Sequence, residues 1–146
     1  MSLSPDTFDR LNRVIWPALE RSWGLPAGTL EAIAWWETRG TFRDQTSRTG
    51  ARGIFQLRQI ALDQVRQEFG IAADPSNPYQ ASAAAAALMS RYLRLFRGSL
   101  PLALAAYNAG EGTVRRFLRQ TAEGGAGQLP RETREYVVNV VPRIYD

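Results

Sequence analysis

The chain has 146 residues, 45% of them hydrophobic and 22% charged, which is ordinary for one soluble globular domain with a sizeable core. Cysteine and histidine are both absent, which excludes disulfides, thiolate metal sites and a histidine base. The basic side chains are all arginine and the net charge is +4, so an anionic partner is favoured: nucleic acid, a membrane surface or a cell-wall polymer.

Neither the N-terminal residues nor the longest apolar run suggests a membrane protein. The first six residues have no basic region followed by an apolar one, so we expect no secretory signal in this sequence, although one could have been removed. The alanine-rich run at 81–89 is interrupted by Ser82 and is too short to cross a bilayer. We therefore expect no membrane span.

Apolar residues recur at helical spacing along most of the chain, with glycine and proline at the expected ends. Near the N-terminus Ser4 is placed to cap a helix, Pro17 to kink or split it and Gly24 to end it. The expected helices cover residues 5–24, 26–38, 59–69, 81–96, 100–107, 113–120 and 131–145, the last with a late break at Pro142.

Residues 40–53 lose this periodicity and are rich in Thr, Ser, Arg and Gly. They predict a loop or a small irregular hairpin. Because the chain has no internal repeat and no linker, the sequence predicts a single all-α domain over residues 1–146.

The second expected helix is apolar and ends in Glu37, with Gly40 shortly after it. A carboxylate in the last turn meets the negative end of the helix dipole, and Trp35 and Trp36 would keep water away. Both effects disfavour the ionised form, and a carboxyl that stays protonated near neutral pH suits a general acid. A single Glu at a helix end is more often merely solvated, so the neighbouring motifs decide its interpretation.

Two further segments are unusual for a purely structural role. In residues 47–56 two glycines three apart precede an apolar pair and Gln56, whose amide suits sugar hydroxyls. In residues 105–110, Tyr107 and Asn108 stand at a helix end. Singly, a core aromatic and a helix cap are the ordinary interpretations of that pair.

Taken together and in order, these segments resemble the catalytic domain of the soluble lytic transglycosylases, a lysozyme-like family that cleaves bacterial peptidoglycan. The family pattern is Glu-Ser at a helix end, Ser-x-x-Gly-Ala-x-Gly-Leu-Met-Gln, Ala-Tyr-Asn-Ala-Gly and Glu-Thr-x-x-Tyr-Val. The matching residues here are 37–38, 47–56, 106–110 and 132–137, and the resemblance runs from about Pro26 onward. It implies an all-α, lysozyme-like fold.

The resemblance also implies roles for individual residues. Glu37 would be the single catalytic acid and base, with Tyr107 close to it. The side chains implied to line the saccharide cleft are Ser47, Gln56, Tyr107, Asn108, Glu132 and Tyr136. No metal or cofactor is implied. The partner would be peptidoglycan glycan strands and not nucleic acid, and the protein would act as a monomer in the periplasm or cell wall. It would be either a phage virion or lysis protein or a periplasmic protein whose signal was removed.

The chain departs from the family pattern at several positions. Thr38 replaces Ser, and Ile54 and Phe55 replace Leu-Met. Arg58 could hold a substrate carboxylate or point to solvent. Other departures are Gln59, Ala61, Leu62, Ala81 and Ala85. They affect subsite detail rather than the reaction.

The implied reaction cleaves the β-1,4 bond between N-acetylmuramic acid and N-acetylglucosamine and leaves a 1,6-anhydromuramyl product. The nearest alternative is hydrolysis by a goose-type muramidase, which needs a carboxylate to activate water. The positions of the goose-type aspartates hold Ser47 and Arg58 here, so Asp44 is the candidate substitute.

An alternative of another class is a non-catalytic module that binds peptidoglycan or nucleic acid. The nucleic-acid version would use Arg115, Arg116 and Arg119 beside Phe117, although basic helices are more often solvated faces.

Overall fold

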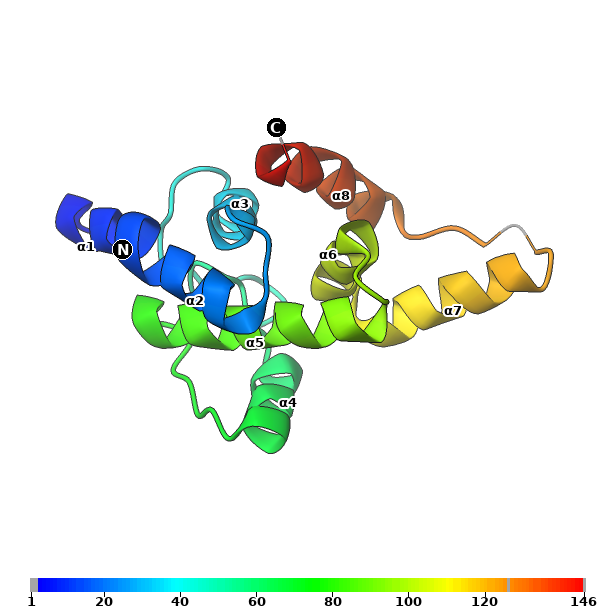
Figure 1. The fold of residues 1–146 in the computed structure, drawn as a ribbon, viewed down its shortest axis with the longest axis horizontal. Coiled ribbons are helices and arrows are strands. Elements are labelled where there is room, and N and C mark those ends of the chain that lie inside the picture. The colour runs from blue at the N-terminus through cyan, green and yellow to red at the C-terminus, as the bar shows by residue number, and fades with distance from the viewer. Residues whose placement is uncertain (1–2, 126, 146) are drawn as a thin grey trace. The chain divides into compact units, whose positions relative to one another are not determined.

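A computed structural model describes residues 3–125 and 127–145 of the chain, and its regular structure is helical (Figure 1). In this part of the chain, extended pairing is limited to isolated bridges that Arg52 makes with Thr46 and Leu57. The all-α prediction with an irregular loop after Glu37 is therefore confirmed. The chain divides into two compact units, Met1–Ser90 and Arg91–Asp146, with the boundary inside a helix.

The first unit begins with a helix that changes its winding twice. Its helices are α1 (Pro5–Arg10), the π-helical turn η1 (Leu11–Ile15), α2 (Trp16–Trp23), α3 (Thr29–Glu37), α4 (Gln59–Phe69) and the greater part of α5 (Pro78–Leu95). Pro17 lies in the first turn of α2, just after the π-helical turn, so the winding changes beside the proline. The helix is not split there, because Ile15 and Trp16 keep right-handed helical dihedrals.

The second predicted helix starts later than expected. We predicted a start at Pro26, but α3 begins at Thr29 because Gly28 has a φ of 90°, which a right-handed helix does not admit. The carbonyl of Pro26 instead closes a turn by accepting hydrogen bonds from the backbone N–H and the hydroxyl of Thr29.

Trp16 anchors the core of the first unit. It is 1% exposed, and its Nε1 donates to the Ser82 hydroxyl on α5 at 2.8 Å. Its ring packs edge-on against Phe55, with centroids 5.9 Å apart, and lies 6.4 Å from the ring of Phe42. Because Phe42 and Phe55 belong to the segment between α3 and α4, this contact fixes the loop within the unit.

The second unit contains the end of α5, α6 (Leu100–Ala109), α7 (Glu111–Ala122) and α8 (Arg131–Ile144). Helix α6 packs against both α7 and α8 (Figure 1). The predicted break at Pro142 is wrong. Helix α8 continues to Ile144, because a proline two residues from the helix end removes only one hydrogen bond.

Among the described residues, no helix combines the length and apolar character that a bilayer crossing requires.

Candidate active site

Glu37 is the last residue of α3 and is half-buried. The body of this helix is buried, with Leu30, Ile33 and Ala34 at 0% exposure. The apolar run therefore holds the helix in the core and delivers the carboxyl-bearing residue at its C-terminal end. The geometry agrees with the predicted position of Glu37 in the last turn.

The hydroxyl of Thr38 holds the chain as it leaves α3. It donates to the carbonyl oxygen of Ala34 at 2.7 Å and accepts from the backbone N–H of Phe42 at 2.8 Å. Thr38 is 2% exposed, so both bonds are shielded from water. A serine hydroxyl could make the same two bonds, which explains why the replacement of Ser by Thr leaves this turn intact.

Ser47 braces the turn that follows. Its Oγ accepts from the backbone N–H groups of Ala51 at 3.1 Å and Thr49 at 3.3 Å. Its own N–H donates to the Ala51 carbonyl at 2.8 Å. The side chain that the resemblance places in the cleft thus shapes the loop backbone from residue 47 to 51.

Gln56 closes the loop from its other end. It has a φ of 50°, unusual for a residue with a side chain. Its Nε2 donates to the backbone carbonyls of Gly53 at 2.9 Å and Gln45 at 3.0 Å. Gln45 in turn donates from its own Nε2 to the backbone carbonyl of Glu37 at 3.3 Å. The loop is therefore tied to the end of α3 through Gln45, a residue that sequence reasoning missed.

Gly53 has a steric reason to be glycine. Its φ is 82°, and a Cβ added there would overlap the carbonyl group of Pro75. This close approach of two backbone segments within the first unit is what the second glycine of the 47–56 segment permits.

In the second unit, Tyr107 and Asn108 occupy the end of α6, and both are half-buried. The side-chain carbonyl of Asn108 accepts from the hydroxyl of Thr133 on α8 at 2.8 Å. Thr133 is 1% exposed. Two of the sequence segments, 106–110 and 132–137, are thus joined by a shielded side-chain hydrogen bond.

Glu132 and Tyr136 face different environments on α8. Glu132 is exposed, whereas Tyr136 is 0% exposed. The ring of Tyr136 therefore belongs to the core around α8, and Glu132 presents a carboxyl at the start of the helix, where the helix dipole favours negative charge.

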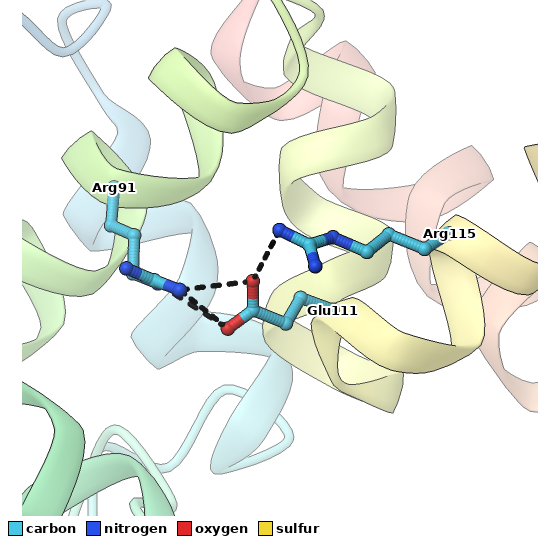
Figure 2. Close-up of polar contacts among 3 residues, drawn as sticks. All are labelled: Arg91, Glu111 and Arg115. Carbon is cyan, nitrogen blue, oxygen red and sulfur yellow. Dashed lines mark hydrogen bonds and ion pairs between the residues drawn. The ribbon is translucent and has the colours of Figure 1, made fainter.

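An ion-pair cluster follows the turn at Gly110, where α6 ends and α7 begins (Figure 2). Arg91 on α5 donates from Nη2 to both carboxylate oxygens of Glu111, at 2.9 and 3.1 Å, and Arg115 lies 3.6 Å from the same carboxylate. Burial, together with the Glu111 charge, raises the pKa of the neighbouring Tyr92 to about 12. Sequence reasoning missed this cluster; its one signal was an acid directly after the Ala-Tyr-Asn-Ala-Gly turn.

The model of the transglycosylase SLT domain matches residues 15–129, more than three quarters of the chain. The chain belongs to the transglycosylase SLT domain family. The match includes α3, the loop and the turn after α6, and it ends before α8. No curated protein sequence matches the chain.

Solved structures of lytic transglycosylases share this fold. An inactive Glu-to-Gln mutant of the lytic transglycosylase Slt from Pseudomonas aeruginosa is 28% identical, with a TM-score of 0.77 over 94% of this chain. The 70 kDa soluble lytic transglycosylase of Escherichia coli is 24% identical, with a TM-score of 0.73 over 94% of this chain. A 70 kDa soluble lytic transglycosylase in complex with bulgecin A is 23% identical to this chain, with a TM-score of 0.74.

This SLT domain spans 24% of the Pseudomonas aeruginosa chain and 25% of the Escherichia coli chain. The similarity therefore concerns one part of much longer proteins.

The predicted site residues fall into two groups, one in each unit. The first unit brings together Glu37 and the loop that carries Ser47 and Gln56. The second brings together Asn108 and the start of α8, with Tyr107, Glu132 and Tyr136 on the same two helices. The predicted proximity of Tyr107 and Glu37 concerns both units and stays a prediction.

Proposed function

We propose that this SLT domain is a lytic transglycosylase that cleaves the β-1,4 bond between N-acetylmuramic acid and N-acetylglucosamine in peptidoglycan. The observation that carries the proposal is Glu37 at the end of the buried helix α3, with the 47–56 loop tied to its backbone inside the family match. The similar lytic transglycosylase Slt from Pseudomonas aeruginosa, of which a Glu-to-Gln mutant is inactive, adds support.

Glu37 acts first as an acid and then as a base. It donates its proton to the glycosidic oxygen while the bond to C1 of the muramyl residue breaks through an oxocarbenium-like state. The 2-acetamido group of the same sugar stabilises the positive charge at C1. The Glu37 carboxylate then takes the proton of the muramyl 6-hydroxyl as that oxygen bonds to C1. The enzyme regains its proton, and the product is a 1,6-anhydro ring.

The proposed substrate-binding residues differ in what they have left to offer a sugar. Ser47, Gln56 and Asn108 already make hydrogen bonds inside the protein, so their first task is to hold the 47–56 loop and the start of α8 in place. Gln56 uses its NH₂ group in this way and keeps its carbonyl oxygen to accept from a sugar hydroxyl or amide. Tyr107, Glu132 and Tyr136 complete the proposed set.

Hydrolysis is the second candidate, because Asp44 lies half-buried in the same loop as Ser47. A water-activating carboxylate is the one group that an inverting muramidase needs and the transglycosylase reaction does not. We propose the transglycosylase reaction because capture of an intramolecular hydroxyl avoids the entropic cost of a second reactant.

The proposed setting follows from the substrate. The two units work as one catalytic domain, as a monomer, in the periplasm or cell wall. A phage virion or lysis protein and a periplasmic enzyme both fit this setting, and the net charge of +4 suits an anionic wall polymer.

Mass spectrometry of digested peptidoglycan tests the proposal. We expect 1,6-anhydromuropeptides, which lack a reducing end and are lighter by one water than the products of a hydrolase.

In Glu37→Gln, which keeps the shape but cannot transfer a proton, the rate of product formation should fall by more than about 10²-fold while the circular dichroism spectrum stays the same. Predominantly reducing-end products would replace the transglycosylase reaction with hydrolysis and point to Asp44. Activity of Glu37→Gln within about tenfold of the wild type would remove Glu37 from its role.

A further inference from the structure

Glu20 makes hydrogen bonds at the end of α2 through its backbone and at the start of α3 through its side chain. Its backbone carbonyl accepts from the N–H groups of Gly24 and Leu25 and so ends α2. Its side-chain carboxylate accepts from the backbone N–H of Gly28 at 3.2 Å and of Leu30 at 2.9 Å, at the start of α3. Glu20 is 5% exposed, so this carboxylate is a buried group.

Helix α3 cannot cap its own N-terminus. The first N–H groups of a helix have no partner within it, and a side chain at the N-cap position usually accepts from one of them. Here the N-cap is Gly28, which has no side chain and makes no side-chain cap. Glu20 supplies the missing acceptors from α2, and its negative charge meets the positive end of the helix dipole.

A buried carboxylate carries a cost that an apolar side chain would not. Burial raises the pKa of Glu20 above its ordinary value, and the hydrogen bonds from Leu30, Gly28 and Thr29 oppose that shift. A Leu or Met at this position would fill similar volume without desolvating a charge. The position therefore serves something besides packing.

Helix α3 is well suited to carry a constraint from one end to the other. It is nine residues long, roughly 13 Å, and its buried face includes Leu30, Ile33 and Ala34 at 0% exposure. A short helix packed in this way moves as a rigid element, because a close-packed core does not deform continuously. Glu37 stands at the far end.

We infer that Glu20 is a positioning residue for Glu37: its carboxylate fixes the N-terminus of α3 and thereby the place of the Glu37 carboxyl. The inference rests on the proposed function for its kinetic readout. It concerns a side chain outside the four sequence segments, since none of them includes position 20.

The test compares Glu20→Gln and Glu20→Ala with a matched control, Asn77→Ala. Asn77 caps α5 in the same unit, where its Oδ1 accepts from the N–H groups of Tyr79 at 3.0 Å and Gln80 at 3.1 Å. The control therefore also loses a side chain that accepts two backbone N–H groups, on a helix that carries none of the proposed site residues. Cleavage of soluble, uncross-linked glycan strands is measured at a temperature where circular dichroism shows every variant fully folded.

We expect kcat of Glu20→Ala to fall about tenfold, less than the roughly 10²-fold that a displacement of 1 Å costs, with KM within about twofold of the wild type. Glu20→Gln keeps one acceptor oxygen and should fall between Glu20→Ala and the wild type. Asn77→Ala should keep kcat within about twofold, because a cap lost elsewhere leaves Glu37 in place. A wild-type kcat in folded Glu20→Ala, or an equal loss in Asn77→Ala, would overturn the inference.

A second readout does not depend on cleavage. The carboxyl carbon resonance of Glu37, followed by NMR, should move in Glu20→Ala and stay in place in Asn77→Ala. An unmoved resonance in Glu20→Ala would overturn the role of Glu20 even if the wild type is active. A wild type without activity on glycan strands would overturn the proposed function instead, and the resonance would still decide the role of Glu20.

Discussion

The Thr38 hydroxyl bridges the last turn of α3 and the start of the loop. It donates to Ala34 and accepts from Phe42 at a site that is 2% exposed. A Thr-to-Val substitution keeps the shape but leaves the N–H of Phe42 without this acceptor, and a buried donor left unsatisfied costs about 1–3 kcal/mol.

We therefore expect Thr38→Val to lower the free energy of unfolding by roughly 1–3 kcal/mol and to slow cleavage, since the residue next to Glu37 loses its anchor. Thr38→Ser keeps the hydroxyl, restores the family residue and should stay close to the wild type in both respects. Denaturant unfolding and glycan-strand cleavage measure the two effects. A Val variant that is as stable and as active as the wild type, beside a weakened Ser variant, would show that the methyl group, and not the hydroxyl, matters at this position.

The sequence selects candidate site residues, but it does not predict the contacts that these residues make. Glu37, Ser47, Gln56 and Asn108 could be selected from the sequence because the family pattern marks them. That Ser47 and Gln56 spend their polar atoms on the loop backbone could not be predicted, because those bonds depend on loop geometry that has no periodic signal. Gln45 and Glu20 were missed for the same reason, since their partners are backbone groups set by tertiary structure.

At the scale of the elements, the sequence predicts where the helices lie, but it does not always predict where they begin and end. The segment 59–69 was predicted to the residue, because Gly70 ends it in the left-handed conformation that glycine adopts readily. Two proline signals misled: α3 begins after Pro26 and α8 runs through Pro142. Proline limits which hydrogen bonds a helix can make, but the neighbouring glycine or the distance to the helix end decides the boundary.

Helices α6 and α8 are joined by the hydrogen bond from Thr133 to Asn108. If this bond sets the place of the α8 residues Glu132 and Tyr136 beside α6, its loss should appear both in stability and in cleavage. We expect a double-mutant cycle of Asn108→Ala and Thr133→Val to give a coupling of about 1 kcal/mol in the free energy of unfolding. Thr133→Ser, which keeps the hydroxyl, should cleave glycan strands at nearly the wild-type rate.

Additive effects, within about 0.5 kcal/mol, would mean that the two side chains stabilise their helices separately. Cleavage that survives both single substitutions would make the pair structural and take Asn108 out of the proposed substrate-binding set.

At the scale of the whole molecule, charge is divided unevenly along the chain. Residues 1–90 hold nine arginines and nine carboxylates, whereas residues 91–146 hold nine arginines and five carboxylates, so the second unit carries the net charge of +4. Part of this excess lies on α7, where Arg116 and Arg119 are exposed. An anionic polymer should meet its main attraction there.

Binding to an anionic wall polymer should then depend on where arginine is removed, and not only on how much charge is lost. We expect Arg116→Gln with Arg119→Gln to weaken binding to insoluble peptidoglycan roughly threefold at low salt, with the difference disappearing near 1 M salt as screening shortens to a few ångströms. The matched control is Arg10→Gln with Arg66→Gln, which removes the same charge from exposed positions in the last turns of α1 and α4.

Sedimentation with peptidoglycan measures binding, and a gel shift with DNA tests the nucleic-acid alternative. Arg116 and Arg119 lie three residues apart and so share one exposed face of α7. DNA binding that is lost in the α7 variant while peptidoglycan binding is kept would assign this face to nucleic acid. Equal losses in both variants would reduce its contribution to net charge alone.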